Sequence, residues 1–447
     1  MSADDTAVGS ASTGGAWKTS TAVCVTLGAI AVVALGLRLG YVLSTEAKLI
    51  FPDESQYVNI AQNFATGHGL RTSTNPLTGH VVDFEVQRPP VYPLMLAVVF
   101  RLGGNVRAVQ VVQAVLGALT CLMIYVLAKE LMGEWPARIA GAVSAVYPFY
   151  IYFAGRVLSE TLFLLLFVTS WYYVVRMWRE LNEREAWTRW VASCLLAGLL
   201  GAAAALTRSE ALAVFVLVPV VMVLTGPRRW MGLALGMLML VVLSVGLSPW
   251  VTRNYRLTTI RTHAGDTVRP GAFIPTTLKV GESLYDAVGP WANGAPNKEN
   301  TGWPQHAREL ERDEYARDQY LFDEAVRYMR AHKKRTVRLA GIKLIRMWNI
   351  FPNYEEGRTP LLMTISAVAY IPVILTALVG LWAAMRRPAL VFWLMVPVMV
   401  LTVVHVIFLG SIRYRMAMMP FVMVLSGAGA WHLACKWLKR RRGTTEP

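Results

Sequence analysis

The sequence predicts an all-α polytopic membrane protein, and both its composition and its apolar segments point to this class. Of the 447 residues, 55% are hydrophobic and only 16% are charged, and the mean hydropathy is +0.42. This balance lies outside the range of ordinary soluble domains. Uncharged apolar stretches recur along the chain, and a stretch of about 20 such residues crosses the roughly 30 Å hydrocarbon core of a bilayer.

Ten segments are expected to cross the membrane as helices. They are residues 20–43, 106–129, 136–154, 158–178, 190–207, 210–225, 229–249, 361–385, 388–409 and 415–435. A further apolar segment, residues 89–104, is too short to cross. It is therefore expected to form an interfacial or re-entrant helix in the first external loop.

The chain divides into five regions by composition. They are a disordered tail at 1–18, a membrane domain at 19–249 with a long external loop at 44–105, an external segment at 250–360, C-terminal transmembrane helices at 361–435 and a basic tail at 436–447. The N-terminal tail carries no cleavable signal pattern. Within the external segment, residues 251–305 are predicted to be structured loop and residues 306–350 helical, ending in a basic amphipathic helix that lies on the membrane.

The formal net charge of +16 is assigned to membrane topology and to anionic membrane lipids, with no nucleic-acid partner. All four cysteines lie in or beside apolar segments, which disfavours a disulfide framework or a thiolate zinc site.

The orientation of the chain is predicted from lysine and arginine in short loops. The basic loops are residues 176–190, 226–230, 385–388 and 436–442. They fall on one face if both termini are cytoplasmic, which places 44–105 and 250–360 outside the inner or plasma membrane. Several arginines then lie on the external face against the positive-inside rule, so they require another explanation.

Ionisable residues gather at that external face. The set comprises Arg38, Asp53, Glu54, Arg88, Arg156, Glu160, Arg208, Glu210, Arg253, Arg413 and Arg415, with Tyr57 and Tyr92 beside them in sequence. Each alone has an ordinary explanation as a helix cap or a snorkelling arginine, and Asp53 could simply start a helix. Because intramembrane charges are costly unless paired, the whole set favours one cavity at the outer membrane surface.

This mixture of groups suits transfer of a sugar from a lipid phosphate. Arginine binds phosphate bidentately and keeps its charge when partly buried. A carboxylate can accept a proton from the acceptor hydroxyl or amine. Neither a P-loop nor a dinucleotide-binding fingerprint is present, which agrees with a membrane-borne donor in place of a nucleotide sugar.

Six stretches carry a resemblance to a known family. They are PDESQY (52–57), NIAQNFATGHGL (59–70), QRPPVYPLMLAVVFRLGG (87–104), GRVLSETLF (155–163), LSPWVTRNYR (247–256) and RYRMAMMPF (413–421). In their order and spacing the sequence resembles the GT-C superfamily of membrane glycosyltransferases, in the branch of protein O-mannosyltransferases and aminoarabinose lipid A transferases. The resemblance implies an active-site cavity on the outer face and a polyprenyl-phosphate sugar donor.

The resemblance also implies roles for individual residues. Asp53 would be the general base, and its neighbour Glu54 would orient an arginine or the donor. Arg88 would meet the lipid phosphate. The resemblance gives no firm role to the remaining residues, which are assigned from their place at the external face. Those assigned to the donor phosphate are Arg38, Arg253, Arg413 and Arg415, and those expected to line the cavity are Tyr57, Tyr92, Arg156, Glu160, Arg208 and Glu210. The expected reaction is an inverting single displacement.

Several alternatives remain open at this stage. Some members of the superfamily bind a divalent metal ion, but His68 and His80 lack ligand spacing, so a metal is left undecided. The external segment does not resemble the β-trefoil of the protein mannosyltransferases, and the acceptor could be a lipid, a glycan or a protein. The rival functions are an oligosaccharide ligase or polymerase and a flippase or transporter for a polyprenyl-linked lipid.

Overall fold

The computed structural model describes residues 21–72, 86–261, 267–295, 303–310, 313–353 and 359–443. The predicted all-α class is confirmed over these residues, where the strands form a single small hairpin of β1 (Ile260–Arg261) and β2 (Thr267–Arg269). The predicted tail at 1–18 lies outside the described residues.

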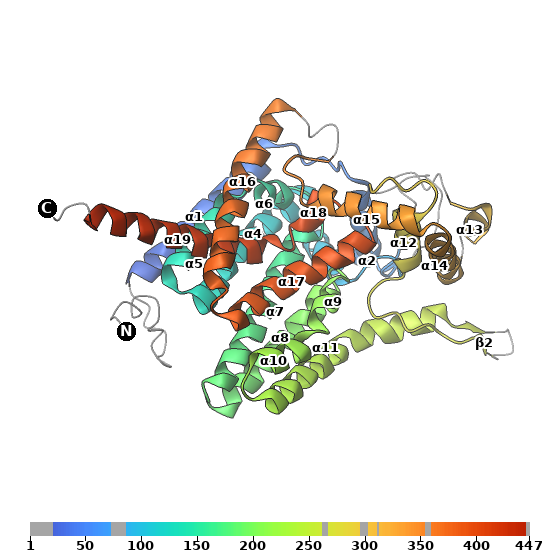
Figure 1. The fold of residues 1–447 in the computed structure, drawn as a ribbon. Helices are drawn as coiled ribbons and strands as arrows, with labels where there is room; N and C mark the ends of the chain where they lie inside the picture. The colour runs from blue at the N-terminus through green and yellow to red at the C-terminus, as the bar shows by residue number, and fades with distance from the viewer. Residues whose placement is uncertain are drawn as a thin grey trace.

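Eight described helices are long and apolar enough to cross a membrane. They are α1 (Thr21–Ser44), α4 (Val106–Met132), α7 (Glu160–Asn182), α8 (Trp187–Ala205), α11 (Arg229–Thr258), α16 (Pro360–Ala384), α17 (Pro388–Ile407) and α19 (Met419–Gly443). Figure 1 shows them as one bundle, in which α4 lies near the centre. Each coincides with a segment that was expected to span.

The other two expected spans are each divided into two shorter helices. Residues 136–154 form α5 (Glu134–Val146) and α6 (Pro148–Ala154), and residues 210–225 form α9 (Ala211–Phe215) and α10 (Val218–Thr225). The sequence-based expectation of one continuous helix in each was wrong. Tyr147 precedes a proline and has an extended conformation, φ −67° and ψ 116°, because proline excludes the helical conformation at the residue before it.

Both divided segments still carry the chain across the bundle. Gln110 and Gln113, in the first turns of α4, donate to the carbonyls of Gly155 and Ala154, just before α7 begins. The helices α4 and α7 therefore start at the same end of the bundle, and α5 with α6 must bring the chain back between them. In the same way, α9 and α10 return the chain from the end of α8 to the start of α11.

Short helices surround the end of the bundle where α1 finishes. In the first external loop these are α2 (Pro52–Ala65) and α3 (Val91–Arg101). With eleven residues α3 is too short to cross, as expected from sequence. The remaining short helices are α12 (Val280–Val288), α13 (Gln305–Glu309), α14 (Glu314–Ala331), α15 (Lys333–Met347) and α18 (Ile412–Arg415). The helices predicted within 306–350 are thus present as α13 to α15.

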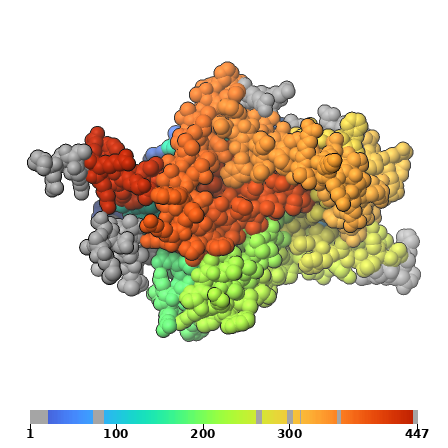
Figure 2. All heavy atoms as spheres, viewed as in Figure 1, coloured from blue at the N-terminus to red at the C-terminus, as the bar shows by residue number. Residues whose placement is uncertain are grey.

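The external segment has a small hydrophobic core of its own, which includes Leu284, Ala307, Leu321 and Ala325. In Figure 2 its yellow and orange atoms cover one end of the bundle and continue without a break from the orange-red helices. Helix α15 buries one face, at Leu339, Lys343 and Met347.

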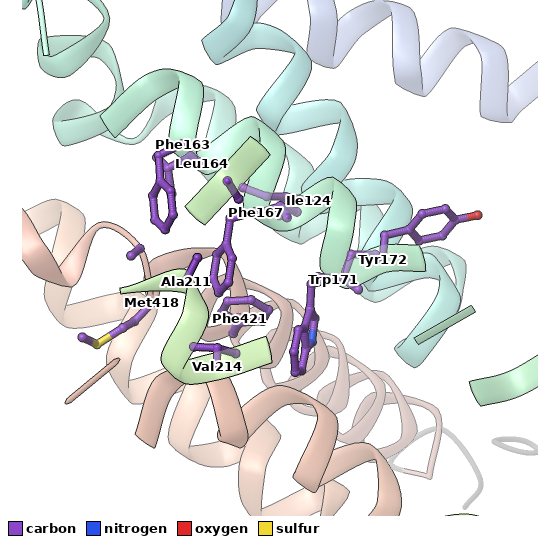
Figure 3. Close-up of a cluster of buried hydrophobic side chains, with 14 of the residues drawn as sticks. Ile124, Phe163, Leu164, Phe167, Trp171, Tyr172, Ala211, Val214, Met418 and Phe421 are labelled. Carbon is purple, nitrogen blue, oxygen red and sulfur yellow. The ribbon is translucent and has the colours of Figure 1, made fainter. Parts of the chain in front are cut away.

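A cluster of aromatic side chains packs beneath this end of the bundle (Figure 3). Phe163, Phe167 and Trp171 follow one another along one face of α7 at helical spacing. The Phe163 and Phe167 rings stack at 5.2 Å, and Phe421 of α19 meets the Phe167 ring edge-on at 5.8 Å. This close packing holds the start of α7 rigidly against α19.

Arg38 lies inside the bundle, away from the other predicted site arginines. Its Nη1 donates to the carbonyls of Ala34 (2.9 Å) and Ala145 (3.0 Å), and its Nη2 donates to Ser144 and to the Cys121 sulfur. The side chain is fully buried. It therefore satisfies carbonyls at the end of α5, where Pro148 interrupts the helix, and its contacts give no support to the predicted role in binding phosphate.

We predict that Arg38→Met lowers the stability of the protein without removing the site at the end of the bundle. The methionine keeps the apolar stem and removes four buried hydrogen bonds, which should cost about 3 kcal/mol. The apparent melting temperature in detergent measures the effect. Arg330→Met, at an exposed position of α14, is the control. An unchanged melting temperature for Arg38→Met would contradict the structural role.

Candidate active site

Six of the predicted residues form a connected set at the end of the bundle. We call this set the acid–arginine cluster, and it consists of Asp53, Arg88, Glu160, Arg208, Glu210 and Arg413. They come from the first turn of α2, the turn before α3, the first residue of α7, the connection between α8 and α9, and α18. Five separate parts of the chain thus contribute to one site.

Asp53 is held between two arginines. Its Oδ1 accepts from Nη2 of Arg88 at 2.5 Å, and its Oδ2 accepts from Nη1 of Arg413 at 2.9 Å. The Asp53 side chain is 33% exposed, more than any other carboxylate of the acid–arginine cluster. It is therefore the carboxylate that a substrate can reach.

Glu160 and Glu210, the other two carboxylates of the acid–arginine cluster, are also paired with arginines, so acids and arginines alternate from Asp53 into the protein. Arg413 also donates its Nε to Oε1 of Glu160, and Arg208 donates to the same oxygen at 2.8 Å. Nε of Arg208 bonds Glu210 at 2.6 Å. Because burying an unpaired charge costs several kcal/mol, this alternation is what allows so many charges to share the end of a membrane bundle.

The charges also fix the protonation of Asp53. Burial alone would raise its pKa, but the positive charges of Arg88 and Arg413, with a smaller effect of Lys279, outweigh burial and hold the pKa well below its usual value. For Arg88, burial acts to lower the pKa and the Asp53 carboxylate raises it above its usual value. Both groups are therefore charged across the physiological range of pH.

The carboxylate of Glu54 bonds backbone N–H groups and, among the described residues, no arginine. Its Oε2 accepts from the N–H groups of Ile50 (2.6 Å) and Phe51 (2.8 Å), and its Oε1 accepts from the N–H of Val157 at 2.8 Å. A buried carboxylate thus ties the start of α2 to the turn before α7. This tie sets Asp53 opposite Glu160, so its observed role is to position the site.

The two predicted tyrosines, Tyr57 and Tyr92, pack beneath the Arg88 guanidinium, Tyr57 directly and Tyr92 through Tyr57. The Arg88 guanidinium lies over the Tyr57 ring, 5.0 Å from its centroid, and the Tyr57 hydroxyl bonds Ser159 at 3.3 Å. Tyr92 meets Tyr57 edge-on at 4.8 Å and donates to Gln113 at 2.6 Å. Tyr57 therefore contacts the acid–arginine cluster directly, and Tyr92 fixes Tyr57.

Arg156, Arg253 and Arg415 were expected at the cavity but bond backbone carbonyls elsewhere. Arg156 donates to the carbonyl of Lys48, Arg253 to that of Leu70, and Arg415 to that of Asn349. Residues two apart on a helix do not share a face. For this reason Arg413 reaches the acid–arginine cluster while Arg415 points away from it.

Sequence reasoning missed Lys279, which precedes α12 in the external segment. The neighbouring positive charge of Arg88, followed by burial, lowers the pKa of Lys279. The lysine therefore lies close to the Asp53–Arg88 pair. No motif marked it, since its position depends on how the external segment docks.

A chain of hydrogen-bonded polar side chains connects the external segment to Arg88. Arg88 Nε donates to Gln56 (2.8 Å), Gln56 to Gln87 (3.3 Å) and Gln87 to Glu282 of α12 (3.3 Å). Glu282 is in turn paired with Arg317 of α14 at 2.7 Å. The external segment is thereby connected to the acid–arginine cluster.

A small cavity adjoins the deep end of the acid–arginine cluster. Its lining includes Glu160, Arg208, Arg413 and Tyr414. Oε2 of Glu160 is buried and has no hydrogen-bond partner among the described residues. The cavity therefore offers an acceptor atom that a polar group of a ligand or a water can use.

The described residues do not provide an evident metal site. Among them no group of three or more His, Cys, Asp or Glu side chains is arranged to hold an ion. His68 bonds the Thr66 hydroxyl at 2.8 Å, and His80 lies outside the described residues. An ion at Asp53 and Glu160 would have to displace Arg413 from both, so the donor set fits a guanidinium better than a divalent metal.

Fold and site together define a polytopic helical membrane protein with a cluster of paired carboxylates and arginines at one end. Residues 87–252, somewhat more than a third of the chain, match the family described as dolichyl-phosphate-mannose-protein mannosyltransferase. This match includes four members of the acid–arginine cluster. No curated protein matches the chain in sequence.

Solved structures of the oligosaccharyltransferase AglB from Archaeoglobus fulgidus share the fold. The complex with an inhibitory peptide and a dolichol-phosphate gives a TM-score of 0.59, and the apo form gives 0.60. In both cases the identity is 13%, over 96% of this chain and 52% of AglB. The chain thus spans about half the length of AglB.

A weaker likeness is to ArnT from Cupriavidus metallidurans bound to undecaprenyl phosphate. Its TM-score is 0.41 and its identity 15%, over 92% of this chain and 78% of ArnT. The match to the mannosyltransferase family over residues 87–252 and the fold shared with AglB agree with the resemblance seen in the sequence motifs.

We predict that Glu54→Ala destabilises the protein, because three backbone N–H groups lose a charged acceptor at once. Hydrogen bonds to charged groups contribute about 1.5–3 kcal/mol each, so a loss of at least about 3 kcal/mol is expected. Thermal unfolding in detergent measures it, with Glu185→Ala as the control at a helix-to-helix turn. A variant of normal stability that has lost all transfer would instead assign Glu54 to the chemistry.

Proposed function

We propose that this protein transfers a sugar from a polyprenyl-phosphate-linked donor to a cell-envelope acceptor, which is a lipid, a glycan or a protein, on the outer face of the membrane. The observation that carries this proposal is Asp53, a partly exposed carboxylate held between Arg88 and Arg413. One group that can accept a proton lies beside groups that can hold a phosphate. A transferase needs both within reach of one sugar.

The charge of the site supports a lipid monophosphate as donor. Four cations lie at the site, namely Arg88, Arg208, Arg413 and Lys279. Three carboxylates face them, Asp53, Glu160 and Glu210. The three arginines and three carboxylates balance each other, and Lys279, which also lies near the charges of Glu282 and Asp286, adds a cation beside Arg88 that suits the single negative charge of a sugar phosphodiester. The family description names a dolichyl-phosphate sugar, and AglB was solved with a dolichol-phosphate.

The proposed reaction is a single displacement with inversion at the anomeric carbon. The acceptor oxygen attacks that carbon while its proton passes to Asp53. The bond between the anomeric carbon and the phosphate oxygen breaks, and the bonding electrons leave with the polyprenyl phosphate. This product carries one more negative charge than the donor did, and Arg88 stabilises it as it develops.

The placement of the site on the outer face rests on the direction of the helices. The acid–arginine cluster lies at the end where α1 finishes and α19 begins, so the two termini of the described chain share the opposite end (Figure 1). The basic turns 226–230 and 385–388 join helices at that opposite end. By the positive-inside rule this end is cytoplasmic.

A second candidate is transfer of an oligosaccharide from a lipid diphosphate. It is favoured by the fold shared with AglB, an oligosaccharyltransferase. A diphosphate diester brings two negative charges to a site where Lys279 is the one cation beyond those paired within the acid–arginine cluster, so the monophosphate fits better. A flippase for polyprenyl-linked lipids would use the arginines but has no need of a reachable carboxylate.

We predict that Asp53→Asn lowers the rate of sugar transfer by about 10²–10⁴-fold, the usual contribution of a general base. The rate is measured with purified protein and a radiolabelled polyprenyl-phosphate sugar. Asp313→Asn is the matched control, because Asp313 also pairs with an arginine, Arg269, at 2.7 Å. A rate close to that of the wild type in Asp53→Asn would remove Asp53 from the mechanism.

We also predict a preference for donors with one phosphate. Purified protein given matched donors should turn over the monophosphate at least about tenfold faster than the diphosphate, a difference of about 1.4 kcal/mol. Product analysis by mass spectrometry, with envelope glycans of a deletion strain compared with its parent, identifies the sugar. Faster turnover of the diphosphate donor would favour the oligosaccharide transferase.

A further inference from the structure

Both oxygens of Asp53 accept hydrogen bonds from guanidinium groups. A carboxylate in this state is a poor base, because each arginine stabilises its charged form and protonation would break an ion pair. The proposed reaction requires the same carboxylate to accept a proton. Something must therefore release one of its oxygens before transfer.

The contacts of Arg88 allow it to exchange Asp53 for another anion. Its Nε is anchored by Gln56 at 2.8 Å, and its guanidinium rests on the Tyr57 ring. Only Nη2 bonds Asp53. Arg88 can therefore keep its contacts with Gln56 and Tyr57 while its Nη2 turns from Asp53 to another anion, and phosphate is an anion that arginine binds with high geometric specificity.

Lys279 places a second positive charge near Arg88. Among the described residues its ammonium makes no direct hydrogen bond or ion pair, and the charges that act on it are those of Arg88, Glu282, Asp53 and Asp286. A cation beside another cation and without a direct partner is stabilised by an arriving anion. Lys279 and Arg88 together therefore present a receptor for one phosphate group.

Arg413 keeps Asp53 in place during such an exchange. It bonds Oδ2 of Asp53 and also Glu160, which is paired separately with Arg208. If Arg88 leaves Oδ1, the carboxylate is still held at Oδ2. The freed Oδ1 then has an unused lone pair at the exposed side of the site.

We propose that Asp53 pairs with Arg88 until the donor phosphate binds. The phosphate then bonds Arg88 and Lys279 in its place, and this exchange frees Asp53 to act as the base. This inference rests on the proposed function and adds a regulation to it. The base becomes available only when a donor is bound. In the absence of donor, the ion pair keeps Asp53 from activating a hydroxyl.

The test is the affinity for undecaprenyl phosphate, measured in detergent with purified full-length protein. Asp53→Asn removes the competing anion, so it is expected to bind the lipid about tenfold more tightly than the wild type. Lys279→Gln is expected to bind it about tenfold more weakly. The matched controls Asp313→Asn and Lys334→Gln should bind as the wild type does.

Two further binding measurements, with undecaprenol and with inorganic phosphate, identify which part of the lipid phosphate the protein recognises. Uncharged undecaprenol should bind Asp53→Asn and wild type equally, because only the phosphate competes with Asp53. Inorganic phosphate should displace the lipid only weakly, because it lacks the polyprenyl chain. Tighter binding of undecaprenol by Asp53→Asn, or inorganic phosphate bound as well as the lipid phosphate, would overturn the proposal.

Unchanged or weaker binding of undecaprenyl phosphate by a folded Asp53→Asn would also overturn the inference. Should that variant fail to fold, normal affinity in Lys279→Gln overturns it. The proposed function fails separately, when Asp53→Asn still transfers sugar at the wild-type rate. Binding and transfer are therefore independent readouts, and a failure of one proposal can be told from a failure of the other.

Discussion

The site depends on one guanidinium, that of Arg413. It joins Asp53 and Glu160, which lie 360 and 253 positions away in the sequence. The first external loop, the start of α7 and the short helix α18 are thereby held at one point. Charges at the end of a membrane bundle are costly unless each has a partner of opposite sign. The alternation of acids and arginines meets this requirement and still leaves Asp53 within reach of a substrate.

The helical membrane fold could be predicted from sequence, because the length of an apolar run reports directly on the thickness of the bilayer. All eight long helices fall where an apolar run lies. The division of 136–154 into α5 and α6 could not be predicted in this way, because Pro148 is equally compatible with the first turn of a helix and with an interruption. In the structure Arg38 bonds the carbonyls beside that interruption.

The convergence of the site was also predictable, since helices that alternate in direction bring every second loop to the same end. What the sequence could not provide was the direction of each side chain. Arg413 and Arg415 belong to one motif, yet only Arg413 reaches Asp53, and Arg415 lies over the Tyr370 ring. Lys279 escaped notice because the external segment is placed by long-range contacts, such as the N–H of Leu278 on the carbonyl of Val86 (3.1 Å).

The most direct test of the central claim is an experimental structure of the protein with undecaprenyl phosphate bound. If the acid–arginine cluster is the donor site, the phosphate will contact Arg88 and Lys279, while Asp53 has lost Arg88 and remains bonded to Arg413. A phosphate bound elsewhere, with the pair of Asp53 and Arg88 intact, would contradict the assignment of this cluster to the chemistry.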